Sequence, residues 1–402
     1  MSEPQTLEQN AAAANGLVLA LNSGSSSLKF GLYRVSSSET ALLISGIAES
    51  TGSDSGDFLA HDSRSHRDVH ETVSMRGPDD VLARIVRLLD EWGAPAPTCV
   101  GHRIVHGGPT LRAHCLIDEA VLVTLQAAVA FAPLHMPPAL AVIRFAREHF
   151  PDVPHVACFD TAFHATMLAV ARTLPLPEWL RSAGIERYGF HGLSCESIVR
   201  QLGRDLPHRL IIAHLGNGSS ITAVRDGHSI DTSMGLTPTG GVIMGTRSGD
   251  LDPGLLVYLM REKSFDVDQI ENLVNHHSGL LALSGTTSDM RRLRNVADTD
   301  ADAALAIQMY GYSVAKQIAA MMTALKGVDL LVFAGGIGEN DGRTRMLICS
   351  YLEWTGIALD ETRNAGARDS ISAENSNVAV HVISSEEDAQ IAIHSDALVR
   401  SH

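Results

Sequence analysis

The sequence is short of basic residues and has no long apolar run. Its 402 residues include 31 Lys and Arg against 46 Asp and Glu, a formal net charge of −15. Without a basic stripe to offset repulsion from phosphates, nucleic-acid binding is disfavoured, although a small anionic ligand needs only a local basic pocket. No apolar run approaches the ~18 residues of a membrane span. We therefore expect neither nucleic acid nor a membrane as a partner.

Cysteine is scarce, and its spacing indicates no disulfide framework. Five cysteines occur, and no two of them form a CxxC pair. Such a set is typical of reduced thiols in a cytosolic protein, and it disfavours a structural zinc site. Residues 1–16 lack both the basic start and the apolar centre of a signal peptide. We expect a disordered tail there and a cytoplasmic location.

Two common nucleotide-binding motifs are also missing. The sequence has no G-x-x-x-x-G-K-[ST] stretch, which excludes a Walker-type site. GGIGEN, at 335–340, follows an apolar run, but its glycine order departs from G-x-G-x-x-G and no N-terminal βαβ unit surrounds it. A dinucleotide-dependent oxidoreductase is therefore disfavoured.

What the sequence does contain is an unusual polar hairpin near its start. The segment LNSGSSSLKF, residues 21–30, places four serines and a glycine between two apolar runs that predict strands. Exposed N–H groups in a Gly/Ser turn form a nest for anionic oxygens, and the hydroxyls add donors. The composition suits phosphate, with a plain turn as the alternative.

The same pattern returns about halfway along the chain. LIIAHLGNGSSITAVRDGHSI, residues 210–230, again runs from a strand through a Gly/Asn/Ser loop into a second strand. Because the two similar segments are short, a chance similarity is the alternative to a duplication. A duplication predicts two similar α/β halves, each giving one polar hairpin to a shared cleft.

The remaining pattern predicts further strands and helices. We expect a third strand at 41–48, polar excursions without regular structure over 49–80, and an amphipathic helix at 81–92 capped by Asp79. The other expected elements are strands at 98–100, 155–160, 328–334 and 378–384, helices near 118–131, 138–149 and 302–326, the last of these stopped by Gly327, and a final helix starting near 385.

Basic residues occur in Gly-rich surroundings at three places. GHRIVHGG contains His102, Arg103 and His106, GTRSGDLDPG contains Arg247, and ERYGFHGLS contains Arg187 and His191. Neighbouring glycines allow a ligand to approach closely, and the planar guanidinium matches carboxylate and phosphate oxygens. These residues are candidates for an anion cradle, with ordinary surface ion pairs as the alternative.

Two carboxylates complete the set of candidates. Asp160 follows a buried strand, where α/β sheets place ligand contacts, and Glu386 begins the final helix, where helix capping is the alternative. Beside a bound phosphate, such hard oxygen ligands suit Mg²⁺.

Seven motifs, in order along Leu17–Ala392, together resemble the acetate kinases and, more widely, the acetate and propionate kinases. They are NSGSSSLK, GHRIVHGG, FDTAFH, RYGFHG, HLGNGSS, MGTRSGDLDP and GGIGEN. The resemblance implies the fold of sugar kinases, Hsp70 and actin, namely two duplicated α/β domains of ribonuclease H-like type with an interdomain cleft. It also implies a homodimer that transfers the γ-phosphoryl group of ATP to acetate with Mg²⁺, or Mn²⁺ as the alternative metal.

The resemblance also implies roles for individual residues. Catalysis would involve Arg103, Asp160, His191 and Arg247, with His191 and Arg247 stabilising the transition state and Asn22 and Glu386 serving the metal. The substrate methyl group would contact Val105, Leu134, Phe190 and Pro238, while Arg103 would bind its carboxylate. ATP would be bound by Lys29, with Ser25 and Ser27 in the same loop, and by His214, Leu215, Gly216, Asn217, Gly218, Asp289, Met290, Arg291, Gly335, Gly336, Ile337, Gly338 and Asn340.

The sequence departs from the family pattern at several positions near the substrate side. The departures are Met136 in PLHMP, Cys195 in FHGLSC, TPTGG at 237–241 and SSEED at 384–388. They leave the preference between acetate and propionate open, so a propionate kinase is one alternative. An actin- or Hsp70-like ATP-driven binding module is a second.

The same resemblance suggests domain boundaries. We expect an N-terminal actin-like domain over 17–160, a nucleotide-binding domain over 161–385, and a C-terminal helix within 386–402 that packs back on the N-terminal domain.

Overall fold

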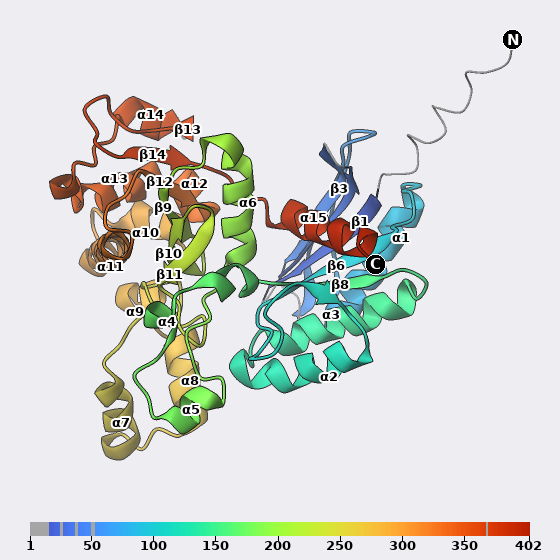
Figure 1. Ribbon diagram of the computed structural model, residues 1–402, viewed down its shortest axis with the longest axis horizontal. Helices are drawn as coiled ribbons and strands as arrows, with labels where there is room; N and C mark the ends of the chain where they lie inside the picture. Colours follow the sequence, from blue (N-terminus) through green and yellow to red (C-terminus); the bar gives the residue numbers. More distant parts are fainter. Residues whose placement is uncertain (1–15, 25–26, 37–38, 50–52, 367–368) are drawn as a thin grey trace, which may run out of the picture. The chain divides into compact units, whose positions relative to one another are not determined.

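The computed structural model describes residues 16–24, 27–36, 39–49, 53–366 and 369–402 (Figure 1). The chain divides into two compact units, here named unit 1 (up to Ala162, together with Glu386–His402) and unit 2 (Phe163–Ser385). Of the predicted tail, residues 1–15 lie outside the described residues. Gly16 does not belong to a tail, because it begins the first strand.

Unit 1 is built on one mixed sheet with the strand order β5-β4-β3-β2-β1-β6-β8-β7. Strand β1 pairs antiparallel with β2 through the predicted polar hairpin and parallel with β6 on its other side. The strands are β1 (Gly16–Ser23), β2 (Ser27–Val35), β3 (Thr40–Glu49), β4 (Ser53–Asp62), β5 (Arg67–Met75), β6 (Cys99–Ile104), β7 (Cys115–Leu116) and β8 (His155–Phe159).

Alternation along the central strands gives the unit 1 sheet two covered faces. Leu19 and Leu21 belong to a core that also contains apolar side chains of α1 (Pro78–Glu91) and α3 (Met136–His149). The other face carries α15 (Glu387–Arg400), which packs on β1 and β6 (Figure 1). A Cβ on Gly101 would lie 2.3 Å from Ser395 Oγ, so only glycine allows this helix to approach so closely.

Unit 2 contains a second sheet, with the order β11-β10-β9-β12-β14-β13. Helix α11 (Ala301–Leu325) packs on β9 and β10, and Cys195 and Ile198 of α6 (Gly192–Leu202) share a core cluster with the alternate side chains of β9 and β12. The strands are β9 (Arg209–Leu215), β10 (Ser219–Arg225), β11 (His228–Thr232), β12 (Leu330–Ala334), β13 (Asp369–Ser370) and β14 (Ala379–Val382).

The two sheets share one arrangement. In unit 1 the order β3-β2-β1-β6-β8 and in unit 2 the order β11-β10-β9-β12-β14 both place an antiparallel meander beside two parallel strands. The predicted pair of similar α/β halves is therefore confirmed.

Two local predictions were wrong. Residues 49–80, expected to be irregular, contain β4 and β5, which pair antiparallel. Strand β5 places Val69, Val73 and Met75 on its covered face, but Glu71 interrupts them and the other face is polar. Three apolar residues in a mostly polar stretch give only a weak alternating pattern. Helix α1 starts earlier than expected: Gly77 is its N-cap, and Asp79 lies within its first turn.

The remaining helices lie between the strands and helices described above, in both units. None of the helices in the described ranges is both long and apolar enough to cross a membrane. The remaining elements are α2 (Glu119–Ala127), η2 (Ala128–Phe131), η3 (Ala162–Thr166), α4 (Ala169–Arg172), α5 (Glu178–Ser182), η4 (Gly203–Asp205), α7 (Pro253–Glu262), α8 (Val267–His276), α9 (Gly279–Ser284), α10 (Met290–Val296), α12 (Gly335–Asn340), α13 (Gly342–Ser350), η5 (Glu353–Thr355) and α14 (Glu361–Gly366).

Candidate active site

In unit 1, the predicted residues Arg103 and Asp160 form a buried ion pair. Arg103 lies in β6 and Asp160 follows β8, and these strands are parallel neighbours, so both residues reach the same edge of the sheet. Arg103 donates from Nε and Nη2 to Asp160 Oδ2, at 3.0 and 2.6 Å. The carboxylate is only 1% exposed, so the guanidinium is held in a fixed orientation.

Asn22, at the end of β1, connects this ion pair to the final helix. Its Oδ1 accepts a bond of 3.2 Å from Arg103 Nη1, while its Nδ2 donates to Glu387 (3.2 Å) and Asp388 (2.7 Å). Lys29 lies directly across the hairpin from Asn22 and is exposed. Ser25 lies outside the described residues.

This cluster of Asn22, Arg103, Asp160, Glu387 and Asp388 is rich in carboxylates. Burial disfavours the charged guanidinium, but the neighbouring carboxylates outweigh burial and raise the pKa of Arg103. Burial raises the pKa of Asp388, and Glu387 adds to the rise, whereas the bond from Asn22 lowers it. Three carboxylates around one guanidinium leave excess negative charge, and their hard oxygens suit a divalent cation.

In unit 2, two glycine-rich segments meet at the ends of parallel strands. Strands β9 and β12 are neighbours, with Ala334 opposite His214. The loop His214–Gly218 and helix α12 therefore start from the same edge. Gly335 has φ 75° and a Cβ there would lie 2.8 Å from the Leu215 carbonyl oxygen, so glycine is required.

His191 is held by two separate contacts at the start of α6. Its Nδ1 lies 3.0 Å from Ser220 Oγ, and its ring stacks on His214 with the centroids 4.3 Å apart. His214 Nδ1 in turn lies 2.8 Å from Ser194 Oγ. His191 also has φ 59°, a backbone conformation that is uncommon outside glycine and clusters at functional sites.

The side chains of His191 and Arg247 converge on Gly218. A Cβ on Gly218 would lie 3.3 Å from His191 Nε2 and 3.3 Å from Arg247 Nη1. Arg247 Nη1 also donates to the Pro238 carbonyl oxygen at 3.1 Å. Two nitrogen donors thus face one point beside a glycine-rich loop, an arrangement that can stabilise the oxygens of a phosphoryl group.

The other predicted nucleotide residues surround the same loop. Asp289 caps α10 and accepts from Arg291, whose side chain is exposed, while Met290 is buried. A Cβ on Gly245 would lie 2.5 Å from Asn217 Oδ1 and 3.5 Å from Ser288 Cβ, which places Asn217 close to the start of α10. Asn340 donates to the Gly336 carbonyl oxygen within α12.

Other basic candidates have structural partners. Arg187 donates to the carbonyl oxygens of Ala171, Thr232, Ser233 and Met234, so its predicted anion contact is not supported by its bonds. His102 is buried with its Nε2 3.0 Å from His155 Nδ1. His106 accepts from the Gly108 N–H and stacks on Phe131.

The predicted substrate residues occur in both units. In unit 1, Val105 is buried just after β6 and Leu134 is half-buried. In unit 2, Phe190 is buried next to His191, and Pro238 is half-buried beside Arg247. Val105, Phe190 and Pro238 thus lie close in the chain or in space to Arg103, His191 and Arg247 respectively.

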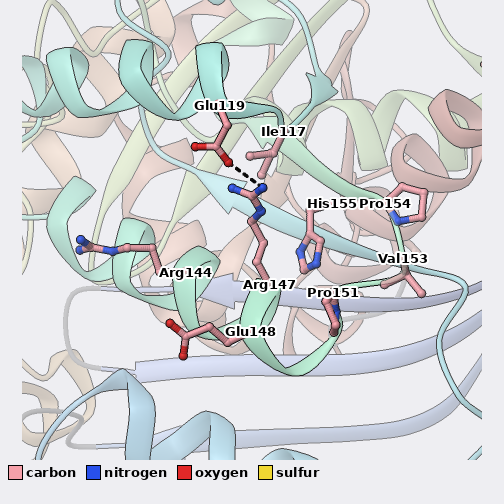
Figure 2. A pocket seen from close by; sticks show the side chains of 9 residues that line it. All are labelled: Ile117, Glu119, Arg144, Arg147, Glu148, Pro151, Val153, Pro154 and His155. Atoms are coloured by element: carbon pink, nitrogen blue, oxygen red, sulfur yellow. Dashed lines mark hydrogen bonds and ion pairs between the residues drawn. The ribbon is translucent and has the colours of Figure 1, made fainter.

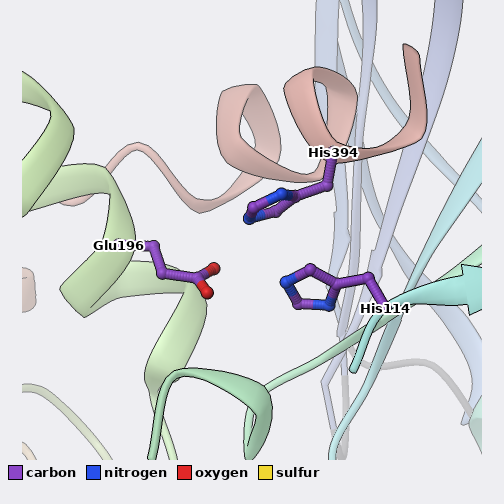
Figure 3. A group of neighbouring side chains, drawn as sticks. All are labelled: His114, Glu196 and His394. Carbon is purple, nitrogen blue, oxygen red and sulfur yellow. The ribbon is translucent and has the colours of Figure 1, made fainter. Parts of the chain in front are cut away.

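Two further features of unit 1 contain none of the predicted site residues. A cavity of about 420 Å³ lies between the end of α3 and the start of β8, where Arg147 donates to Glu119 (Figure 2). The rings of His114 and His394 lie 4.0 Å apart (Figure 3). His114 Nδ1 accepts from the Phe159 N–H at 3.0 Å, so its proton is on Nε2 and that atom is not a free metal ligand.

Sequence reasoning missed four residues that contact the predicted ones. Glu387 and Asp388 bond to Asn22, while Ser194 and Ser220 bond to the two histidines. The run of three acids after Ser385 was a usable signal for the first two. Ser220 ends the HLGNGSS motif and Ser194 lies in FHGLSC, but neither motif indicates which histidine each hydroxyl contacts.

Comparison with known proteins places these features in a family. The sequence model of the acetokinase family matches residues 17–393. The acetate kinase of Methylocella silvestris is 40% identical over 399 residues, which cover 95% of this chain and 98% of the relative.

Two solved structures resemble the whole chain. A propionate kinase from Francisella tularensis superposes with a TM-score of 0.89 at 37% identity, covering 95% of this chain and all of the other. The acetate kinase of Porphyromonas gingivalis gives 0.84 at 34% identity, covering 96% of this chain and all of the other. The chain therefore belongs to the acetokinase family, whose acetate kinases are phosphotransferases that use ATP and act on a carboxylate.

Proposed function

We propose that the protein transfers the γ-phosphoryl group of ATP directly and in line to acetate, giving acetyl phosphate and ADP, in a reversible reaction. The observation that carries the proposal is the convergence of His191 Nε2 and Arg247 Nη1 beside Gly218 in a glycine-rich loop. Phosphoryl transfer relies on positioning and charge stabilisation more than on covalent help from the protein, and this arrangement supplies both.

No general base is needed for the attack. The carboxylate of acetate is already ionised at neutral pH, so the main obstacle is repulsion between that anion and the phosphates of ATP. Arg103, Arg247 and His191 supply the compensating charge and donors. Arg103 donates three of its five N–H groups to Asp160 and Asn22. The other two can donate to the substrate carboxylate.

We propose Mg²⁺ as the metal, with Mn²⁺ as the alternative, held by Asn22 and Glu386 near Asp160. The oxygen-rich cluster around Asn22 fits a hard divalent cation because its carboxylates outnumber its guanidinium. A bound cation would supply positive charge that offsets the negative charge of the phosphates. The residues of the chain orient the reactants: Asn22 fixes the carboxylates of α15, and Asp160 fixes Arg103.

Acetate is the proposed acceptor, with propionate as the alternative. Val105, Leu134, Phe190 and Pro238 would contact the methyl group. One additional methylene in an apolar pocket changes binding by only about 1–3 kcal/mol. The two acids therefore differ in kcat/KM by a factor that the pocket residues do not predict, and both need to be measured.

The test is a hydroxamate assay on the full chain. Protein, MgATP, hydroxylamine and either acetate, propionate or butyrate are mixed, and acyl hydroxamate is measured. Acetate should give product, and a chelator of divalent cations should abolish it until Mg²⁺ is restored. No hydroxamate with any of the three acids would contradict the proposal and favour the ATP-driven binding module.

We also propose that the protein works in the cytoplasm as a homodimer. Helix α7 of unit 2 has no buried residue, and Leu255, Val257, Tyr258 and Met260 are each 40–50% exposed. A second copy that covers these side chains would remove them from water. Light scattering after gel filtration should give twice the chain mass, and Tyr258→Glu should shift the protein toward the monomer. A monomeric parent protein would contradict this.

A further inference from the structure

Glu339, in α12, accepts hydrogen bonds from two separate parts of unit 2. Its Oε1 accepts from the backbone N–H of Gly335 at 3.0 Å and from the backbone N–H of Ser385 at 3.0 Å. Gly335 is the first residue of α12, whereas Ser385 is the last residue of unit 2 before the chain returns to unit 1. One half-buried oxygen therefore joins the predicted nucleotide segment to the point where the chain leaves the unit.

The segment Ser384–Glu386 has a second attachment. Gln201 Nε2, near the end of α6, donates to the Ser384 carbonyl oxygen at 3.0 Å. Helix α6 is the helix whose N-cap is His191. Both bonds to the segment thus come from elements that carry predicted site residues. The segment itself ends on Glu386, the predicted metal ligand, after which α15 begins.

Helix α12 has little freedom to move without affecting Glu339. Arg345, which is fully buried, donates from Nη1 to the carbonyl oxygens of Gly338 (2.7 Å) and Glu339 (3.0 Å). At the other end, Gly335 packs against the Leu215 carbonyl oxygen. Glu339 Oε1 accepts both hydrogen bonds, from Gly335 and from Ser385. A ligand that orders or shifts α12 therefore changes the geometry of both bonds.

We propose that Glu339 is a positioning residue that couples nucleotide binding at α12 to the segment that carries Glu386. The inference rests on the proposed function, in which α12 contacts ATP and Glu386 serves the metal. Nucleotide bound at α12 strengthens the Glu339–Ser385 bond and so fixes the start of α15. In the absence of nucleotide the segment opens more often.

Hydrogen exchange followed by mass spectrometry tests this in the full-length protein. ADP with Mg²⁺ should slow exchange in a peptide covering α12 and also in a peptide covering residues 383–386. Glu339→Ala should exchange about tenfold faster at Ser385 and lose the ADP protection there, because the acceptor is gone. Glu339→Gln keeps an Oε1 acceptor and should restore the protection.

Two further variants keep the test decisive. Ser385→Pro removes the second N–H donor and leaves Gly335 unchanged, so it should lose ADP protection around the segment while α12 stays protected. Glu353→Ala changes an exposed glutamate of η5 and should behave like the parent protein. In steady-state assays, Glu339→Ala should raise the KM for ATP and the Mg²⁺ requirement by about tenfold, with Glu339→Gln close to the parent.

The outcomes separate this inference from the proposed function. If ADP protects neither peptide in the parent protein, the proposed nucleotide site at α12 is wrong. If α12 is protected but the 383–386 peptide responds equally in the parent, Glu339→Ala and Ser385→Pro, the coupling is wrong and the nucleotide site stands. Failure of Glu339→Gln to restore protection would also overturn the coupling.

Discussion

The two units present opposite chemistry on the same sheet arrangement. At the edge of the unit 1 sheet, Arg103 is surrounded by Asp160, Glu387 and Asp388. At the corresponding edge in unit 2, His191 and Arg247 face Gly218, and the bonds of His191 and Arg247 described above go to a serine hydroxyl and a carbonyl oxygen. An acid-rich edge favours a cation, whereas a base-rich edge favours an anion.

This difference arises although the strands follow the same order in both units. In unit 1, the helix that lies on the polar edge is α15, which begins with Glu387 and Asp388. In unit 2, α6 starts directly after His191. Helix α15 therefore adds two carboxylates to the edge of unit 1, whereas α6 begins directly after a histidine at the edge of unit 2.

The largest expected effect comes from removing either arginine. Arg247→Ala and Arg103→Ala should each lower kcat by at least about two orders of magnitude, because a single arginine that stabilises a transferring phosphoryl group contributes roughly 10³–10⁵ in rate. The hydroxamate assay measures this, with Arg343→Ala, at an exposed position, as the control. Near-normal rates in both would disprove their roles.

The same two variants should differ in stability. Arg103→Ala removes the guanidinium that is paired with the buried Asp160 carboxylate, and breaking a buried ion pair in this way typically costs about 3–5 kcal/mol. Arg247 Nη1 donates to a neutral acceptor, the Pro238 carbonyl oxygen, and loss of such a bond typically costs about 0.5–1.5 kcal/mol, so we expect a smaller loss of stability in Arg247→Ala. Urea denaturation followed by circular dichroism measures both. Equal losses would contradict the contrast between the two edges.

A smaller effect is expected for Gly218→Ala. The added methyl group would lie 3.3 Å from both His191 Nε2 and Arg247 Nη1, so each donor must shift by a few tenths of an ångström. We expect kcat to fall about 10- to 100-fold, since catalysis depends on such positioning, with little change in Tm. Gly235→Ala, where a Cβ meets nothing within 4 Å, is the matched control. An unchanged rate would show that the donors do not act at this point.

Ser220→Ala should have a milder effect than the glycine change. It removes the hydroxyl beside His191 Nδ1, which helps to set the tautomer and orientation of the ring. We expect kcat to fall about tenfold with little change in KM. Ser194→Ala, which acts on His191 only through the stacked His214 ring, should lose less. The reverse order would contradict the assigned bonds.

The smallest effect concerns acid stability in unit 1. Burial lowers the pKa of both His102 and His155. Because the unfolded chain binds protons near pH 6.5 while the buried rings stay neutral, their contribution is complete above that pH and is lost as the pH falls. The loss is about 1.4 kcal/mol per pH unit for each ring.

Urea unfolding at about pH 7.5 and about pH 5.5 measures this contribution. The drop in unfolding free energy should be smaller in His102→Phe than in the parent protein, since one titrating group is gone. His149→Ala, which alters an exposed histidine, should leave the drop unchanged. An identical drop in all three proteins would exclude the buried pair as its source.

Much of the fold was predictable because its signals are local. Apolar runs ending in Gly/Ser turns identified β1, β2, β9 and β10, and the repeat of that pattern indicated the duplicated halves. The β4–β5 hairpin was missed because the apolar face of β5, formed by Val69, Val73 and Met75, is interrupted by Glu71 in a mostly polar stretch.

The sequence by itself determined which residue types stand at the strand ends and in the turns: Asn22, Arg103, Asp160, His191 and Arg247 are all recognisable from their motifs. Only the tertiary structure decided their partners. Asn22 donates to Glu387 and Asp388, more than 360 positions away in the chain. Arg187 donates to backbone carbonyl oxygens instead of facing a ligand site. The physical reason is that turns and strands depend on neighbours in the chain, whereas a side chain's partner depends on which strand and which helix the sheet order brings beside it.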